Sequence, residues 1–95
     1  MIYLNVLLNV KSPDDIAKVR GLLLRQAEAS RSEAGCQRFE VYQSHNDPSL
    51  FMLIERWDTQ QHVDRHRQGH AFREIYEPLV LPLVNRAPHP SDLVS

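Results

Sequence analysis

The sequence predicts a single α+β domain in which two helical segments cover one face of a four-stranded antiparallel sheet. Three observations lead to this prediction. Two segments show the apolar alternation with a period of two that is typical of strands, a segment with helical periodicity lies between them, and a dense group of turn-forming residues joins two of the strands. A chain of 95 residues is long enough for one domain only.

The first predicted strand covers residues 2–10. Its even-numbered positions are all apolar, whereas its odd-numbered positions mix apolar and polar residues, so one face of the strand is suited to a core. The apolar face consists of Ile2, Leu4, Val6, Leu8 and Val10.

A helix is predicted from Ser12 to a point just before Gly35. Ser12 can cap the helix, proline suits the first turn at position 13, and Asp14 and Asp15 complement the positive end of the helix dipole. The apolar residues that follow recur at helical spacing, and glycine is a common residue just beyond a helix end. This stripe contains Ile16, Val19, Leu23 and Ala27.

Residues 36–44 and 50–57 are predicted to form a hairpin, because the residues between them favour turns. The second of these strands is apolar on both faces, which is typical of a sheet that is covered on both sides. The chain has helices for one face only. We therefore expect a homodimer that packs sheet against sheet.

The second helical region is predicted from Asp58 or Thr59 to about Gln68, with a short continuation over residues 70–76. The last strand is predicted at residues 79–84, with Pro78 just before it and Pro82 within it, and these prolines favour a sheet edge or irregular pairing. The order β-α-β-β-α-β is the ferredoxin-like arrangement. The expected organisation is one domain over residues 1–95, in which residues 87–95 form an extended tail that could lie across a partner subunit.

Composition restricts the class of protein. Lysine and arginine number 11 against 12 acidic residues, for a net charge of −1, which provides no electrostatic footprint for nucleic acid or an anionic membrane. No apolar run approaches the roughly 20 residues of a membrane helix, and the N-terminus lacks the features of a signal peptide. The single cysteine, Cys36, is expected to be a buried structural thiol, and a cytoplasmic location is the default expectation.

The segment HVDRHRQGH places His62, His66 and His70 four residues apart, on one sector of a continuous helix. Metal binding is not the predicted use, because Gly69 interrupts the helix and no HExxH pattern or nearby cysteine is present. Three isolated glycines exclude the phosphate-binding loops, and no motif marks an activated serine. The remaining candidate is a pocket between the helices and the sheet.

Four polar or amphipathic residues stand on strands that should be central, and two interpretations of them remain open. They could bind a ligand in that pocket. Alternatively, the aromatic ones are ordinary core residues with a satisfied polar tip, and the acidic one forms an ion pair with Arg38 or Arg56. The four residues are Asn5, Tyr42, Glu55 and Trp57.

Residues 35–57 (GCQRFEVYQSHNDPSLFMLIERW) and 62–72 (HVDRHRQGHAF) together resemble the antibiotic biosynthesis monooxygenase family. The resemblance extends over roughly residues 1–85, and its specificity comes from the joint spacing of several short motifs. These motifs are Gly35-Cys36, Phe39–Gln43, Asp47-Pro48, Glu55 with Trp57, and His66 with His70.

The resemblance implies ferredoxin-like protomers that pair as a dimeric α+β barrel. It also implies a monooxygenase that needs no cofactor, in which a small phenol or hydroquinone is deprotonated in a dry pocket and itself gives an electron to O₂. On this basis the expected catalytic residues are His66 and His70, as base or oxyanion donor, and the expected substrate-binding residues are Asn5, Tyr42, Glu55, Trp57 and Phe72.

Several positions depart from the family pattern. Ala71 adds one residue between the second histidine and the following aromatic residue, and Leu53 stands where monooxygenases of the family often carry asparagine. In haem-degrading members, an asparagine on the first strand, a helix tryptophan and an axial histidine form the site. Asn5 matches the first of these, but His66 and Tyr76 replace the other two, which argues against haem degradation.

Other functions remain as alternatives. The same fold could form a dimer that binds a small ligand without catalysis, and the family also includes haem-handling proteins and isomerases of small carbonyl compounds. His62 lies outside the family pattern and is predicted to be a surface residue that can be replaced with little effect.

Overall fold

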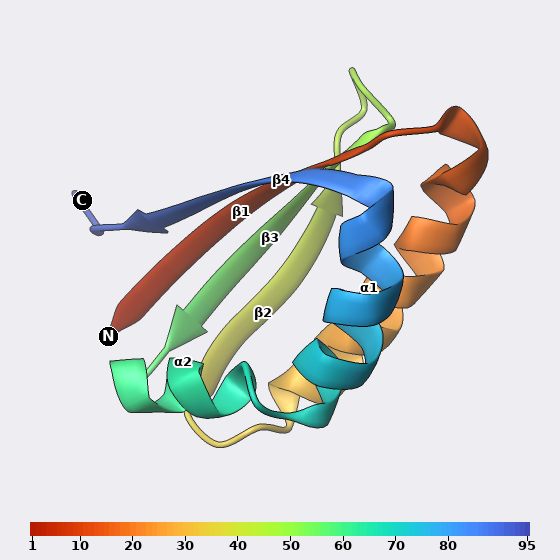
Figure 1. Cartoon of the computed structure of the whole chain (residues 1–95). Helices are drawn as coiled ribbons and strands as arrows, with labels where there is room; N and C mark the ends of the chain where they lie inside the picture. Colours follow the sequence, from red (N-terminus) through yellow and green to blue (C-terminus); the bar gives the residue numbers. More distant parts are fainter.

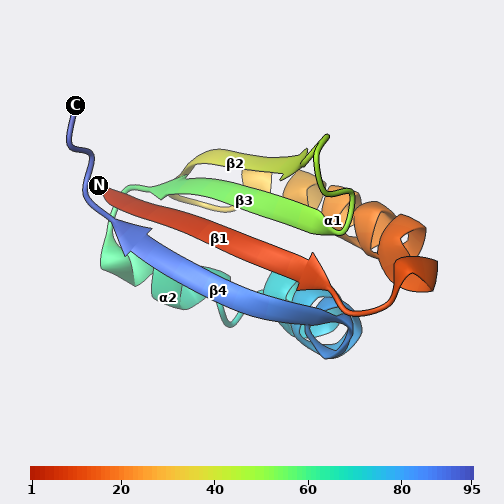
Figure 2. The same ribbon diagram turned by 90° about the horizontal axis from the view of Figure 1, so that it is seen from above.

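A computed structural model describes all 95 residues as two layers, a four-stranded antiparallel sheet and a set of helical segments packed on one of its faces (Figure 1). In Figure 2 the strands lie in front of the helical segments, so the viewer faces the side of the sheet that no helix covers. The strand order is β2-β3-β1-β4. The strands are β1 (Ile2–Val10), β2 (Cys36–Gln43), β3 (Leu50–Trp57) and β4 (Val84–Ser91). This arrangement confirms the predicted ferredoxin-like α+β fold.

The helical layer begins with a short 3-10 turn at the proline that the sequence places in the first helical turn, although the Ser12 side chain makes no capping hydrogen bond. The first helix ends before Gly35, whose φ of 81° lies in the left-handed region. Thr59 caps the second helix by accepting a hydrogen bond from the backbone N–H of His62. The helical segments are η1 (Pro13–Asp15), α1 (Ile16–Arg31), α2 (Gln60–His66), η2 (Ala71–Val80) and η3 (Leu81–Leu83).

Burial along β3 alternates without interruption from Leu50 to Trp57. Phe51, Leu53 and Trp57 are buried under the helices, whereas Leu50, Met52 and Ile54 are half-buried on the other face. This pattern follows from the period of two in a strand, and it confirms that both faces of β3 are largely apolar. A core cluster of 16 residues fills the space between the sheet and the helices.

The last strand lies further along the chain than the sequence predicts. The expected strand at residues 79–84 is instead the end of a π-helix over Ala71–Val80 and a 3-10 turn over Leu81–Leu83. β4 covers Val84–Ser91 and pairs with β1 along its whole length, so residues 87–91 belong to the chain's own sheet and are not a free tail.

Two prolines inside β4 explain this error. Pro88 and Pro90 are two residues apart, so their missing N–H groups lie on the same side of the strand, and an edge strand tolerates this on its unpaired side. The predicted edge position of the last strand is confirmed. None of the helices combines the length and the apolar character that a membrane crossing requires.

Candidate functional site

A small cavity of about 40 Å³ lies between the sheet and the helical layer. Its lining includes the apolar Leu4, Val6 and Phe72 and the exposed polar residues Arg67 and His89. Five elements of the fold each contribute one further polar side chain. The convergence of polar groups from five elements on one concave space is typical of a functional site. These groups are Gln26 from α1, Glu55 from β3, His66 from α2, Tyr76 from η2 and Arg86 from β4.

Glu55 occupies a position on β3 that the strand alternation assigns to the core, and it is only 7% exposed. The indole Nε1–H of Trp57 donates a hydrogen bond to Glu55 Oε1 over 3.0 Å. Burial raises the pKa of Glu55 above its ordinary value, and the Trp57 hydrogen bond, His66 when it is protonated, and the charge of Arg86 oppose this shift. The carboxyl group can therefore retain its proton at a higher pH than an exposed glutamate.

His66 is the most enclosed histidine, at 6% exposed. Its ring lies 4.5 Å from the ring of Trp57 and 5.9 Å from that of Phe72, measured between centroids. Its Nδ1 atom is 2.6 Å from Glu33 Oε1. Because an ionised carboxylate can only accept, Nδ1 carries a proton, and the neutral ring then presents a lone pair on Nε2.

The position of His66 separates the cavity from the protein surface. His66 lines the cavity and also a surface groove that contains Glu33, whereas Glu33 lines the groove alone. The His66 ring therefore borders the cavity as well as the groove that holds Glu33. A carboxylate that orients a histidine from behind is the arrangement by which many enzymes position a general base.

Tyr76 is buried, and its hydroxyl oxygen accepts a hydrogen bond of 3.0 Å from Nε of Arg86. Burial raises the pKa of Tyr76, and the Arg86 charge and hydrogen bond oppose this. The phenol therefore stays protonated at neutral pH, and its O–H remains able to donate. Gln26, which is also buried, has a side-chain oxygen without any hydrogen-bond partner.

Four of the predicted site residues are brought together. Glu55, His66 and Phe72 line the cavity, and Trp57 contacts both Glu55 and His66. Phe72 also packs against the ring of Tyr76, with 5.3 Å between the centroids. The structure therefore brings four of the seven predicted site residues together in one place.

The other predicted residues lie elsewhere. The His70 side chain is 65% exposed and pairs with Glu74 on the protein surface. Asn5 points to the uncovered face of the sheet, where it donates to Ser91 Oγ over 3.1 Å. Tyr42 is 46% exposed on that same face and donates to Glu40. A strand's period of two places both residues on the opposite side from Glu55.

The three histidines of HVDRHRQGH do not converge. His66 pairs with Glu33, His70 with Glu74, and His62 Nδ1 lies 2.8 Å from Thr59 Oγ1. No group of three or more histidine, cysteine, aspartate or glutamate side chains gathers in an arrangement suited to a metal ion. His62 is half-buried and packs over Gly35, which corrects its predicted place as a free surface residue.

Cys36 is half-buried at the start of β2. Burial, reinforced by the nearby carboxylates of Glu33 and Glu55, raises the pKa of the Cys36 thiol to about 11. The thiol is therefore protonated at neutral pH and is a poor nucleophile, as the sequence predicts for a structural cysteine.

Sequence reasoning missed six polar residues at the site, which are Gln26, Glu33, Arg67, Tyr76, Arg86 and His89. One of them had a detectable signal. Gln26 falls on the buried stripe of α1 that contains Val19, Leu22 and Leu23, and a polar residue on such a stripe needs a partner. Arg86 had no such signal, because the strand that carries it was placed too early in the chain.

A sequence model of the antibiotic biosynthesis monooxygenase family matches residues 1–78. The chain belongs to this family. The family includes monooxygenases, and the match covers every polar cavity residue except Arg86 and His89, which lie beyond it. Among curated proteins, none matches the chain in sequence.

Solved structures agree with the family assignment. A crystal structure of an antibiotic biosynthesis monooxygenase superimposes with a TM-score of 0.91 at 23% identity, and the match covers 100% of both chains. A conserved protein of unknown function from Bacteroides thetaiotaomicron, described as a possible oxidoreductase, reaches 0.89 at 21% identity over 97% of this chain and 96% of its own. A Pseudomonas aeruginosa protein reaches 0.85 at 20% identity, covering 99% of this chain and 95% of its own. These likenesses establish the fold shared by the family.

Proposed function

We propose that this family member is a monooxygenase that oxidises a small phenol or hydroquinone with O₂ and without a cofactor. The observation that carries the proposal is the placement of His66, whose Nδ1 contacts Glu33 and which lines a cavity together with Phe72 and Tyr76. A base and a hydrogen-bond donor that line one pocket are the two groups that such a reaction needs.

Proton removal is the first step. The Nε2 lone pair of His66 takes the proton of the substrate hydroxyl, and the Glu33 carboxylate stabilises the resulting imidazolium. The O–H of Tyr76, polarised by Arg86, donates to the phenolate oxygen. Phe72 and Tyr76 form an aromatic wall beside the substrate, and Trp57 packs against the His66 ring.

Oxygen transfer then uses the electrons of the substrate alone. The phenolate passes one electron to O₂, and the resulting phenoxyl radical and superoxide combine to form a new carbon–oxygen bond. Protonation and cleavage of the O–O bond release water and leave a quinone. One oxygen atom enters the product and the other leaves as water, so four electrons pass from the phenol to O₂ and the protein supplies none.

The cavity has to widen before it can hold such a substrate. Its volume of about 40 Å³ has room for water, whereas protein cavities that bind benzene measure about 150 Å³. The cavity borders on β4, an edge strand with a single neighbour, and on Phe72, which is half-buried. Movement of these two elements is the route of entry that the fold offers.

The small volume specifically favours a second candidate, a dimer that binds a small ligand without catalysis. In this alternative, the buried Glu55–Trp57 hydrogen bond and the Glu33–His66 pair serve stability, and the cavity recognises a compact polar molecule. The two functions differ in whether bound ligand is consumed together with O₂.

A homodimer that pairs the uncovered sheet faces completes the proposal. Leu7, Met52 and Ile54 are half-buried there, and Tyr42 is exposed among them. A partly apolar sheet face on an 11.0 kDa chain is suited to a second copy, because a chain of this size has a thin core of its own.

Oxygen consumption tests the proposal. Purified protein is mixed with a panel of phenols and hydroquinones in an oxygen electrode, and catalase is then added. The proposal predicts substrate-dependent uptake with no oxygen returned by catalase, since the second oxygen atom becomes water. Tyr76→Phe should lower kcat about 100-fold, whereas the matched control Tyr42→Phe on the other sheet face should leave it unchanged.

Three results would overturn or redirect the proposal. An absence of uptake with every substrate contradicts the oxygenase. Saturable shifts of the cavity amide resonances without turnover would support the ligand-binding alternative. A Soret shift on addition of haem that Tyr76→Phe abolishes would support a haem-handling protein instead.

A further inference from the structure

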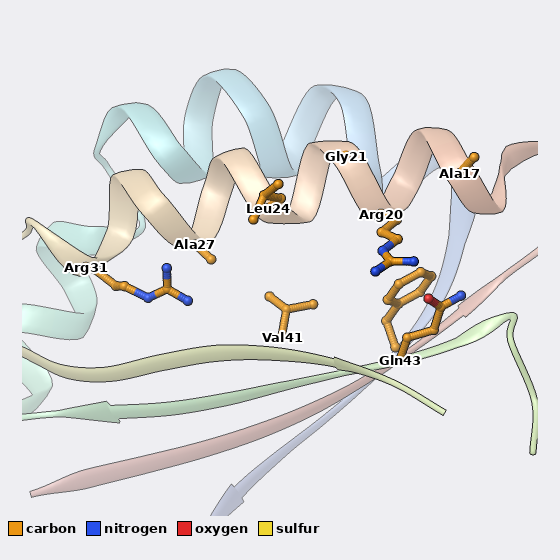
Figure 3. A pocket seen from close by; sticks show the side chains of 9 residues that line it. Ala17, Arg20, Gly21, Leu24, Ala27, Arg31, Val41 and Gln43 are labelled. Atoms are coloured by element: carbon orange, nitrogen blue, oxygen red, sulfur yellow. The ribbon is translucent and has the colours of Figure 1, made fainter. Parts of the chain in front are cut away.

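A second hollow lies on the other side of α1, between this helix and strands β2 and β3 (Figure 3). Its volume is about 460 Å³, within the range of about 300–1,000 Å³ that is typical of small-molecule sites. The polar cavity and this groove share no lining residue, and Gln26 faces the cavity while Leu24 and Ala27 face the groove. The groove is therefore a separate site.

The middle of the groove is apolar. Leu24 and Ala27 extend from the helix towards Val41 on β2, as Figure 3 shows, and Phe51 of β3 also contributes to the lining. Leu24 remains largely exposed even though the core lies nearby. Gly21 widens the groove further, because a Cβ atom at this position would meet nothing within 4 Å.

Two arginines supply the charge of the groove. Arg20 and Arg31 both extend from α1 towards the sheet (Figure 3). Nε of Arg31 donates to the backbone oxygen of Phe39 over 3.0 Å, which fixes the guanidinium in place. Neither arginine has a carboxylate within 4.0 Å, and no acidic residue lines the groove, although the whole chain carries a net charge of −1.

We propose that this groove binds a small amphipathic carboxylate, with its apolar body over Leu24 and Val41 and its carboxylate on Arg31. An anchored guanidinium that lacks an acidic partner is a preorganised acceptor for a carboxylate, which it can bind through two parallel hydrogen bonds. Arg20 adds a second positive charge on the same helix. The complementarity of charge and apolar surface determines the class of ligand.

The groove would remain accessible in a dimer built from the uncovered sheet faces. Val41 and Phe51 point to the helical side of the sheet, whereas a partner would occupy the opposite side. Binding in the groove also does not depend on the proposed oxygenase activity, because none of the groove residues lines the cavity. The two proposals can therefore fail independently.

Sodium octanoate is a direct probe, with 1-octanol as the neutral molecule of equal chain length. In ¹⁵N-labelled full-length protein, octanoate should produce saturable shifts at the amides of Gly21, Leu24 and Val41. Octanol should bind at least about tenfold more weakly, and added salt should weaken octanoate binding because part of the attraction is electrostatic.

Two variants test the location. Gly21→Leu should place its side chain in the groove, because a Cβ atom there meets nothing within 4 Å, and should keep the fold and abolish the shifts. Arg31→Gln should weaken octanoate at least about tenfold, whereas Arg38→Gln, which removes an arginine on the uncovered sheet face, should not change it. Equal binding of octanol and octanoate, undiminished binding by Gly21→Leu, or shifts confined to other surfaces would each overturn the proposal.

Discussion

At the scale of single residues, the pair formed by Glu33 and His66 connects stability with chemistry. His66 is enclosed by aromatic rings, and its only polar contact in the structure runs outward to Glu33 Oε1. A buried ring nitrogen that loses its partner retains its full desolvation penalty. Glu33 thus fixes the tautomer of His66 and also stabilises the fold.

Removal of Glu33 should therefore destabilise the protein. Glu33→Ala is expected to lower the free energy of unfolding by about 1 to 2 kcal/mol, in the lower part of the range for charge-assisted hydrogen bonds, because the Glu33 side chain is still 24% exposed. Urea denaturation measures this loss. The exposed Glu28 on the same helix provides the control, and an equal effect of Glu28→Ala would contradict the assignment.

Glu55 should make stability depend on pH in the direction opposite to that of a salt-bridged acid. The pKa of Glu55 is raised in the folded state, so the folded protein holds the carboxyl proton more tightly than the unfolded chain does. The resulting stabilisation is complete at a pH below the unfolded-state pKa and is lost as pH rises through the folded-state pKa. Glu55→Gln keeps an oxygen that can accept from Trp57 and cannot ionise. Thermal denaturation should show that the stability of this variant, relative to wild type, rises between pH 4 and pH 8. A stability difference between variant and wild type that stays constant or falls over this range would contradict the raised pKa of Glu55.

The alternation of apolar and polar residues along each strand already predicts which face of the sheet each residue lies on. Leu4 and Val6 mark the core face of β1, so Asn5 between them had to point away from the helices. Phe39 is buried on β2, and Tyr42 has the opposite parity. The resemblance to a family suggested ligand contacts for both residues, and the alternation is the physical signal that separates them from the cavity.

At the scale of elements, two glycines on or next to α1 have opposite roles. Gly35 has a φ of 81°, and a Cβ atom there would lie 2.2 Å from Cγ of His62. Gly21 sits in the middle of the helix with open space around it. The first glycine is required by the turn into β2, whereas no packing reason in this chain requires the second.

Alanine substitutions should separate these roles. Gly35→Ala is expected to lower the free energy of unfolding by about 2 kcal/mol or more, from left-handed strain and the contact with His62. Gly21→Ala should raise it by about 0.5 to 1 kcal/mol through helix propensity. Chemical denaturation of both variants measures the difference, and effects of the same sign would contradict this account.

The last third of the chain shows why some elements could not be predicted. Residues 71–80 form a π-helix, whose periodicity differs from the α-helical period that a sequence search uses. Pro88 and Pro90 resembled a loop, yet an unpaired edge accommodates both. The strands before them matched their predicted ranges closely, because alternation and a dense turn are signals local to the sequence.

At the scale of the whole molecule, the uncovered sheet face determines the expected assembly. We expect light scattering at micromolar concentration to give about twice the protomer mass of 11.0 kDa. Ile54→Lys should shift the protein to a monomer, since it places a charge in the interface while Glu40, opposite on β2, can pair with the lysine in the free chain. Leu79→Lys, on the exposed side of η2, should stay dimeric, and a wild-type mass of 11.0 kDa would contradict the interface.

The most direct test of the central claim compares two histidines that the sequence presents as equivalents. His66 faces the cavity and His70 faces solvent, so oxygen uptake with an active phenol should distinguish His66→Gln from His70→Gln. We predict a fall in kcat/KM of about 100-fold or more for His66→Gln and a change within about twofold for His70→Gln. Wild-type activity in His66→Gln, or an equal loss in both folded variants, would contradict the account.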